Sequence, residues 1–359
     1  NYSAAYAWHG ESSAGGTVTF DAGGFLTVSG LLRGESSTVT VTTSRNGYPN
    51  GVATTQSYTP SSIVGGYQIG ALLWSDEFNL AAGSQPSSAD WTSRLCGQTD
   101  ANGGGTCWNN ESQAYITQAN RSDGNGNMVI TASHATPSPG SCLGAVCQFT
   151  SGRFDSQGKV SIKYGYIEAR IQMPQGRGNW PAMWMLSESI TVNHWPYSGE
   201  IDIAEQWLDN PTRTSGAAHY STGPLSAPAH TYDYGECINA RGNCLDSTPF
   251  ASSYHLYSLA WSPGSLSYFV DGLLFLHLVN TGNAFCGPGR VRNSRTPDCS
   301  ANTQYWPFDD SYFFLIFNNA ISDQSGGGNL YDGSWSTSSM NIDYVRVYAL
   351  DGLGTVKRP

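Results

Sequence analysis

Three acidic residues stand close together in a segment that otherwise has the composition of a buried β-strand. Glu200, Asp202 and Glu205 are interleaved with the apolar residues Ile201 and Ile203. Side chains of a strand point alternately to its two faces, so Glu200 and Asp202 share a face and Glu205 points to the other. A single β-bulge between Asp202 and Glu205 would return the third acid to the shared face. Because like charges on one face destabilise a strand, we expect these acids to serve a common purpose.

The spacing of Glu200 and Glu205 determines what their carboxyl groups could do together. With the bulge, about four strand steps separate the two Cα atoms, roughly 13 Å. Long side chains that lean inward can bring the carboxyl groups to roughly 5 to 5.5 Å, the separation found in retaining glycosidases. The alternative is that the acids lie on a solvent-exposed strand face. That alternative predicts Lys or Arg partners on neighbouring strands and no aromatic residues nearby.

Two tryptophans precede the acidic segment in a second apolar run. Trp180 and Trp184 are four residues apart, so they share one face of a strand. Aromatic rings offer a flat surface on which the C–H faces of a sugar stack, although the same rings also fill hydrophobic cores. Taken alone, the two rings favour core packing. Their combination with three acids on the next predicted strand favours a sugar-binding site.

The composition argues against a charged polymer as the ligand. Only 12% of the 359 residues are charged, 12% are aromatic, and 17 Lys and Arg against 27 Asp and Glu give a formal net charge of -10. The basic residues form no run, so we expect no nucleic acid partner. The sequence has no apolar run long enough for a membrane-spanning helix, so we expect no membrane partner. These features favour an uncharged ligand, and we expect a monomer.

Strand patterns dominate the chain. Short alternating runs in residues 17–44 predict a small β module, and the Ser, Thr, Gly and Pro content of residues 51–66 predicts a linker. Strand patterns then recur from residue 71 to near the end of the chain, and no stretch keeps a helical period over three turns. We therefore expect an all-β fold with two packed antiparallel sheets and at most one short helix. The predicted boundaries are 1–70 for the module and linker and 71–359 for the sandwich.

Eight cysteines fall into four couples of near neighbours along the sequence. The count alone allows 105 disulfide connectivities, but short loops lose the least entropy on closing. Zinc-type spacing is absent, which disfavours a metal site. We expect disulfides, and therefore an oxidising compartment and a secreted, extracellular protein. The predicted pairs are Cys96 with Cys107, Cys142 with Cys147, Cys237 with Cys244, and Cys286 with Cys299.

The segments around the acids are similar to those of a known enzyme family. WPAMWML, WPYSGEIDIAEQ and AAHY resemble the signature run of glycoside hydrolase family 16, and especially its laminarinase (endo-1,3-β-glucanase) branch. The likeness extends over roughly residues 71–350. The flanking segments that carry it are LLWSDEFN, CWNNESQAY, DGNGNMVITA, FTSGRFDSQGKVSIKYGYIEARIQMP, YHLYSLAWSPGSLSYFVDG and MNIDYVRVY.

The resemblance implies a fold, an activity and a substrate. The fold would be a β-jelly-roll sandwich of two antiparallel sheets with a concave sugar cleft. The activity would be secreted endo-hydrolysis of 1,3-β-glucan, a neutral polysaccharide, by a retaining double displacement. The segment GLLRGESSTVTVTTSRNGY loosely resembles part of an immunoglobulin or fibronectin-III module, which implies a small accessory module before the catalytic sandwich.

The family also implies roles for individual residues. Glu200 matches the nucleophile, Glu205 the acid/base, and Asp202 the acid between them, which we expect to hydrogen-bond toward Glu200. No cofactor is implied for catalysis. A structural calcium in many relatives matches Asp343 and the backbone near Glu77, and whether it is bound is left open. The matched substrate-binding residues are Trp180, Trp184, His219, Asn110 and Arg170.

Several alternatives remain at this point. A lone histidine such as His219 is often structural, and Arg170 could instead form an ion pair with Glu168 or another acid. The substrate could be a mixed-linkage 1,3-1,4-β-glucan or a galactan. A non-catalytic glucan-binding protein on the same fold would be expected to lack one of the paired glutamates, and both are present.

Overall fold

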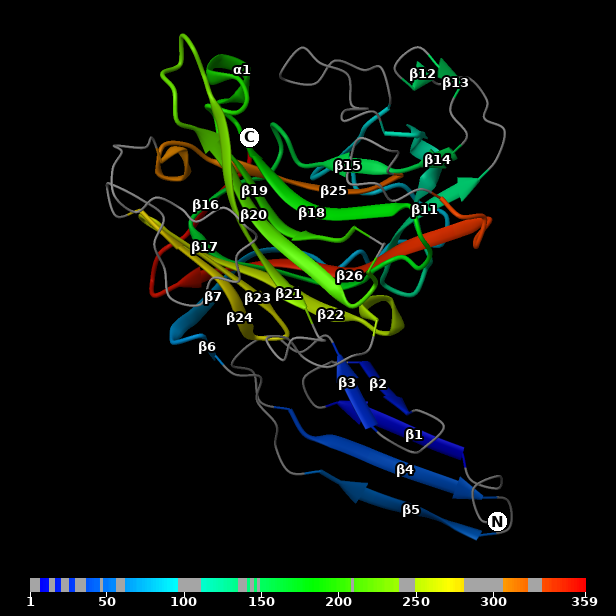
Figure 1. Ribbon diagram of the computed structural model, residues 1–359. Helices are drawn as coiled ribbons and strands as arrows, with labels where there is room; N and C mark the ends of the chain where they lie inside the picture. Colours follow the sequence, from blue (N-terminus) through cyan, green and yellow to red (C-terminus); the bar gives the residue numbers. More distant parts are fainter. Residues whose placement is uncertain are drawn as a thin grey trace. The chain divides into compact units, whose positions relative to one another are not determined.

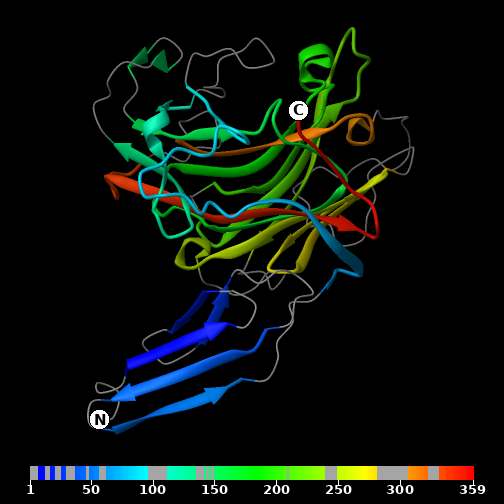
Figure 2. The ribbon, with the colours of Figure 1, turned by 180° about the vertical axis from the view of Figure 1, so that it is seen from behind.

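The chain forms two compact units, Asn1–Ile69 and Gly70–Pro359. The structure, a computed structural model, describes residues 7–12, 17–20, 26–29, 37–45, 48–55, 62–95, 111–134, 141–142, 145–146, 149–207, 210–238, 249–280, 306–321 and 331–359. Figures 1 and 2 show the strands of each unit from opposite sides.

The first unit contains short antiparallel strands. A three-stranded sheet has the order β1 (Ala7–Ser12), β4 (Val39–Arg45), β5 (Tyr48–Thr54), and β2 (Thr17–Phe20) pairs with β3 (Leu26–Ser29). The strands predicted in residues 17–44 are therefore confirmed. The predicted linker 51–66 is wrong at its start, because Val52 pairs with Thr42 and continues β5 along β4. The likeness of this unit to an immunoglobulin or fibronectin-III module stays a prediction.

Two large sheets make up most of the second unit. Nine strands form the sheet that carries the three acids, with β16 and β27 attached to the path at β25 and β16. Its strands, in spatial order, are β21 (His230–Ile238), β20 (Arg213–Ser221), β19 (Glu200–Glu205), β18 (Asn179–Ser187), β25 (Phe313–Ile321), β15 (Arg153–Asp155) and β8 (Thr92–Ser93), followed by β16 (Ser161–Lys163) and β27 (Thr355–Lys357).

The second large sheet has eleven strands. Along its main path the pairs from Leu273–Val279 to Phe149–Ser151 are antiparallel, and Gln113–Tyr115 runs parallel to Phe149–Ser151. The strands in spatial order are β24 (Leu273–Val279), β23 (Ser265–Val270), β22 (His255–Ser262), β17 (Gly165–Gln172), β26 (Thr337–Leu350), β11 (Met128–His134), β14 (Phe149–Ser151) and β9 (Gln113–Tyr115), with β10 (Asn120–Ser122) on β11, β7 (Tyr67–Asp76) on β26 and β6 (Ile63–Val64) on β7.

Helical structure is scarce in the described residues. The α-helix is α1 (Ile190–Asn193), and the 3-10 turns are η2 (Thr117–Ala119), η4 (Phe250–Ser252) and η5 (Pro307–Asp309); β12 (Ser141–Cys142) and β13 (Ala145–Val146) form a separate hairpin. The predicted all-β sandwich of antiparallel sheets is confirmed. Within the described part of the chain, no helix combines the length and apolar character needed to cross a bilayer.

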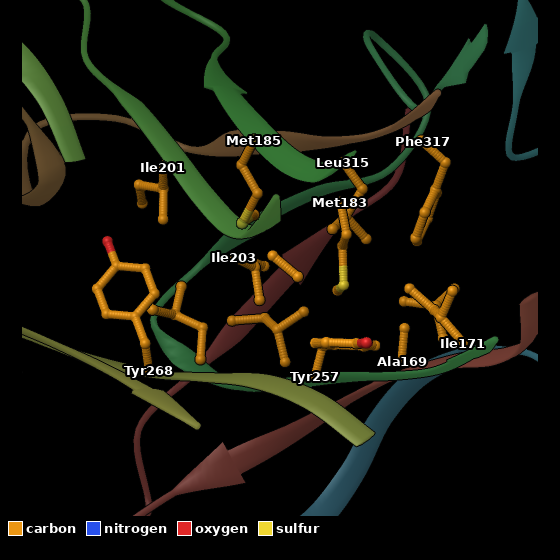
Figure 3. Close-up of a cluster of buried hydrophobic side chains, with 14 of the residues drawn as sticks. Ala169, Ile171, Met183, Met185, Ile201, Ile203, Tyr257, Tyr268, Leu315 and Phe317 are labelled. Carbon is orange, nitrogen blue, oxygen red and sulfur yellow. The ribbon is translucent and has the colours of Figure 1, made fainter. Parts of the chain in front are cut away.

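One hydrophobic core lies between the two large sheets. Met183 and Met185 of β18 and Ile201 and Ile203 of β19 point into it, and Figure 3 shows them facing side chains such as Tyr257 of the other sheet. Each such side chain stabilises the fold by about 1.5 to 3 kcal/mol when fully buried. Burial of these four residues fixes which way β18 and β19 face, so the residues between them point to the outer side of the nine-stranded sheet.

Candidate active site

The three acids lie together on the outer side of the nine-stranded sheet, which we call the acid-bearing face. The register of β19 shifts against β20 between Asp202 and Glu205, and the pairing with β18 shifts at the same level. One extra residue on β19 thus restores Glu205 to the side that Glu200 and Asp202 occupy. The bulge expected from the sequence is confirmed.

The entry into β19 depends on a glycine. Gly199 has a φ of 86°, a conformation that side chains with a Cβ rarely adopt. A Cβ at this position would also lie 2.8 Å from Cγ of Pro307. Gly199 therefore lets the chain turn tightly into β19 and presents Glu200 as its first residue.

Each of the three carboxylates has a ring N–H donor from a different segment. Nε1 of Trp195 donates to Oε2 of Glu200 at 2.6 Å, and Nε1 of Trp180 donates to Oε1 of Glu205 at 2.5 Å. Oδ2 of Asp202 pairs with Nε2 of His219 at 3.0 Å. Asp202 was expected to hydrogen-bond toward Glu200, and its observed partner is instead His219, which lies directly across from Glu200 on β20.

The electrostatics of this group favour retention of protons. Removal from water, and then the charge of Asp202, raise the pKa of both Glu200 and Glu205 above the ordinary value of 4.5. Burial would lower the pKa of His219, but its hydrogen bond to Asp202 and the charge of Glu200 raise it to about 9. At neutral pH an imidazolium thus sits among three carboxyl groups, and a carboxyl that stays protonated can act as an acid.

A pair of stacked tryptophans borders Glu205. The rings of Trp180 and Trp207 lie 4.0 Å apart between centroids, with 27° between their planes. The side chain of Trp207 also hydrogen-bonds to Glu205. Trp180 is half-buried, so part of its ring surface remains accessible beside the carboxyl group.

Sequence comparison assigns this arrangement to a family. Residues 108–291 match the family model described as Glycosyl hydrolases family 16. The β-glucanase of Rhodothermus marinus is 32% identical over 283 residues, which cover 77% of this chain and 84% of that protein. The chain belongs to glycosyl hydrolase family 16. It is therefore a glycoside hydrolase, and the resemblance inferred from the sequence is confirmed.

Two further similar proteins extend the comparison. The keratan-sulfate endo-1,4-β-galactosidase of Sphingobacterium multivorum is 32% identical over 289 residues, covering 78% of this chain and 55% of that protein. The crystal structure of the laminarinase catalytic domain of Thermotoga maritima MSB8 superposes with a TM-score of 0.62 at 28% identity, covering 79% of this chain and 99% of that domain. The jelly-roll fold of the family is thus the fold of the second unit.

Trp184 has a different environment from Trp180. It lies on the acid-bearing face opposite Asp202, but only 8% of its surface is exposed. Its Nε1 donates to Oδ1 of Asn318 at 2.6 Å, and the guanidinium of Arg153 lies 5.0 Å from its ring centroid. The ring also packs in a small apolar cluster with Ala182, Leu186, Ile190, Phe314 and Ile316. Trp184 was expected to bind substrate, and its ring is instead largely covered and supports the site from beneath.

Arg170 does not join the acids. It lies on β17 in the eleven-stranded sheet, between Ala169 and Ile171, which both point into the core. Strand alternation therefore directs Arg170 to the outer side of the opposite sheet, where its guanidinium pairs with Asp343 at 2.6 Å. Its expected role in substrate binding is wrong, and the alternative of an ion pair with an acid is the one observed.

The family 16 calcium position matches Asp343 and the backbone near Glu77, and the carboxylates of both residues are already paired. Asp343 is held by Arg170, and Glu77 accepts two hydrogen bonds from Arg346 at 2.9 and 2.7 Å. A hard cation needs several oxygen ligands with uncompensated charge, whereas each of these carboxylates already has a guanidinium partner. The two carboxylates therefore do not form a calcium site together in this arrangement, and calcium binding at the backbone near Glu77 stays a prediction.

Ligand-type atoms of Glu200, Asp202 and His219 lie within 4.8 Å of one another, which makes them the one candidate metal-binding group in the described ranges. His219 already shares a hydrogen bond with Asp202, and a cation would compete with the proton that holds this pair together. We assign the group to proton and charge balance rather than to metal binding.

Some of the expected residues lie outside the described part of the chain. Asn110 is one of them, so its role in sugar binding stays a prediction. Cys237 is buried and disulfide-bonded. Its partner and the other three predicted pairs involve side chains outside the described residues, so the pairings also stay predictions.

Three rings that sequence reasoning missed surround the carboxylates. Trp195 and Trp207 flank the acidic segment on either side, so proximity to Glu200 and Glu205 in the sequence could have identified both. His230 hydrogen-bonds to His219 from β21. No local pattern marks His230, because its position depends on how β21 pairs with β20.

Proposed function

We propose that this glycoside hydrolase is secreted and cleaves internal bonds of 1,3-β-glucan with retention of anomeric configuration. The observation that carries the proposal is the bulge in β19, which puts Glu200 and Glu205 on one face with a separate N–H donor for each. A pair of carboxyl groups of this kind is what a double displacement at a glycosidic bond requires.

In the first step, the ionised carboxylate of Glu200 attacks the anomeric carbon and forms an ester bond to it. The glycosidic C–O bond breaks as protonated Glu205 gives its proton to the leaving oxygen. The N–H of Trp195 donates to Oε2 of Glu200 and thereby orients the attacking carboxylate. The charge of Asp202 favours the protonated form of both glutamates, while the N–H of Trp195 and the charge of His219 favour the ionised form of Glu200 that this step needs.

In the second step, Glu205 is ionised and accepts a proton from water. The water oxygen attacks the anomeric carbon, the ester bond to Glu200 breaks, and Glu205 is protonated again. The N–H of Trp180 stabilises the carboxylate form of Glu205 that this step needs. Two inversions at the same carbon give net retention.

The choice of glucan rests on two supports. The T. maritima protein with a similar fold is a laminarinase, and the R. marinus relative is a β-glucanase. The acidic net charge of -10 and the exposed rings of the acid-bearing face suit an uncharged sugar chain better than a sulfated one. The similarity to a keratan-sulfate galactosidase makes galactans the appropriate competing substrates.

Release of reducing ends from laminarin, lichenan, agarose and carrageenan tests the substrate. We expect laminarin to give the highest kcat/KM and a mixture of oligosaccharides rather than glucose alone, as internal cleavage requires. A protein that released nothing from laminarin would contradict the proposal, and preferential cleavage of agarose or carrageenan would redirect it to galactans.

Two further measurements test the mechanism. Glu200→Gln and Glu205→Gln should each lower kcat by about 10² to 10⁴-fold or more while circular dichroism stays unchanged. Proton NMR of the first product should show the β-anomer before mutarotation. An α-anomer that appeared first would mean inversion and a different use of Glu200.

Secretion is tested through the cysteines. If the protein matures in an oxidising compartment, thiol titration of the denatured, unreduced protein should find no free thiol among the eight cysteines. Activity should then appear in the culture medium rather than in the cells. Eight titratable thiols would contradict both parts of this expectation.

A further inference from the structure

His230 occupies the edge of the sheet next to the catalytic acids. It is the first residue of β21 and pairs with Ser221 of β20. Its ring is parallel to that of His219 within 7°, with 5.2 Å between centroids, and lies 4.5 Å from the ring of Trp195. His230 thus contacts the donors of two different carboxylates, because Trp195 serves Glu200 and His219 serves Asp202.

A chain of hydrogen bonds runs from the buried acid to this exposed ring. Nε2 of His219 lies 3.0 Å from Oδ2 of Asp202, and Nδ1 of His219 lies 2.9 Å from Nε2 of His230. Both nitrogens of His219 are therefore engaged. The arrangement holds the plane of the His219 ring at two points on opposite sides.

The charges fix the direction of each hydrogen bond. The pKa of His219 is raised to about 9, whereas burial and the charge of His219 lower the pKa of His230. At neutral pH, His219 is an imidazolium that donates from both nitrogens, and His230 is neutral. Nε2 of His230 must then be the acceptor, with its proton on Nδ1.

We propose that His230 is a positioning residue for the proposed hydrolysis, which accepts a hydrogen bond from Nδ1 of His219 and thereby holds Nε2 of that ring on Asp202. The inference rests on the proposed function. His230 acts through His219 and does not contact the reacting atoms.

The effect of His230 on the ionisation of Glu200 follows from the groups packed around its ring. His219 faces it from β20, Tyr232 from β21 itself and Trp195 from the segment before β19. Glu200, Asp202 and Glu205 act on it through His219, whose pKa each of them raises. In return, the positive charge of His219 lowers the pKa of Glu200 and of Glu205. Loss of the acceptor destabilises the imidazolium, and Glu200 then keeps its proton to higher pH.

Two substitutions separate the hydrogen bond from the ring. His230→Phe keeps an aromatic ring against Trp195 and His219 but has no acceptor. His230→Gln removes the ring and keeps an acceptor oxygen. His277→Phe is the matched control, because His277 is a partly buried histidine of β24 in the other sheet, bonded to Ser267.

We expect His230→Phe to lower kcat on laminarin about tenfold, the effect of losing a hydrogen bond to a charged group, with KM almost unchanged. The acid limb of its pH profile should move upward, and His230→Gln should restore both. Histidine NMR should show His219 titrating at lower pH in His230→Phe than in the wild type. His277→Phe should match the wild type in all three measurements.

Two results would overturn the proposed role of His230. A folded His230→Phe variant with the wild-type pH profile and His219 titration would overturn the proposal, and so would a His230→Gln variant as impaired as His230→Phe. If the wild type cleaves no glucan, the proposed function fails on its own. The His219 titration in His230→Phe would still show whether the hydrogen bond holds the imidazolium.

Discussion

Trp184→Phe distinguishes a supporting role of this ring from contact with sugar. The indole of Trp184 is 8% exposed and donates to Oδ1 of Asn318 at 2.6 Å. Phenylalanine keeps an apolar ring in the cluster but removes the N–H and part of the ring volume. The structure therefore predicts that the substitution acts on stability and leaves substrate affinity intact.

The magnitude follows from the two losses. Withdrawal of the donor from a buried amide oxygen costs about 1 to 3 kcal/mol. The space left by the smaller ring adds about 1 to 2 kcal/mol, as for other reductions of buried side chains. We expect the free energy of unfolding of Trp184→Phe to fall by roughly 2 to 5 kcal/mol in all.

Denaturant unfolding and steady-state kinetics on laminarin give the two readouts. Trp180→Phe is the matched variant, because it removes the N–H to Glu205 from a half-buried ring that still stacks on Trp207. Its stability should change by less than about 1 kcal/mol, while kcat/KM falls about tenfold through the lost charged hydrogen bond. If Trp184→Phe kept its stability and raised KM severalfold, the ring would contact sugar and the reasoning would be wrong.

Further predictions concern pH and the opposite sheet. Trp195→Phe removes the N–H that favours ionised Glu200, so the acid limb of kcat/KM should move up by about one pH unit, and an unmoved limb would contradict this. Folding raises the pKa of Glu200 above its ordinary value of 4.5. The ionisation of Glu200 therefore lowers the stability of the fold as the pH rises from the unfolded pKa through the folded pKa. The stability of Glu200→Gln relative to wild type should therefore increase from about pH 4 to about pH 9 in denaturant unfolding; a constant difference would show no shift. Arg170→Met should leave kcat/KM unchanged and lower stability by up to about 1 kcal/mol, and EDTA should leave the melting temperature unchanged, since Asp343 serves an ion pair. Loss of activity in Arg170→Met, or destabilisation of the protein by EDTA, would contradict the assignment of Arg170 and Asp343 to an ion pair away from the active site.

The strands and the bulge could be predicted because their signals are local. A period of two in Ile201 and Ile203 identifies the buried face of β19. The acids at positions 200, 202 and 205 break that period once, and a bulge is the simplest backbone change that reconciles them. Hydrophobic burial and charge repulsion both act on this short segment, so few backbone conformations other than a bulged strand satisfy both.

Arg170 shows where local signals end. Its neighbours Ala169 and Ile171 correctly indicate that it points away from the core. They do not indicate which of the two sheets β17 belongs to, and that depends on its pairing with β22 and β26, whose residues are distant in the sequence. Strands of both sheets show the same alternation of buried and outward residues. The sequence around an outward arginine therefore does not distinguish one sheet from the other.

His230 depends on a different long-range feature, the register of the hairpin between β20 and β21. Residues 222–229 close this hairpin, with Thr222 donating to the carbonyl of Ala229 and Ser221 accepting from the N–H of Ala229. A shift of one residue in β21 would turn His230 and Tyr232 toward the core and bring Asp233 to the acid-bearing face. An extra acid would then face three others, and His219 would lose its acceptor. The turn thus sets the electrostatics of a site to which it contributes no catalytic residue, which is why the acidic segment alone could not reveal His230.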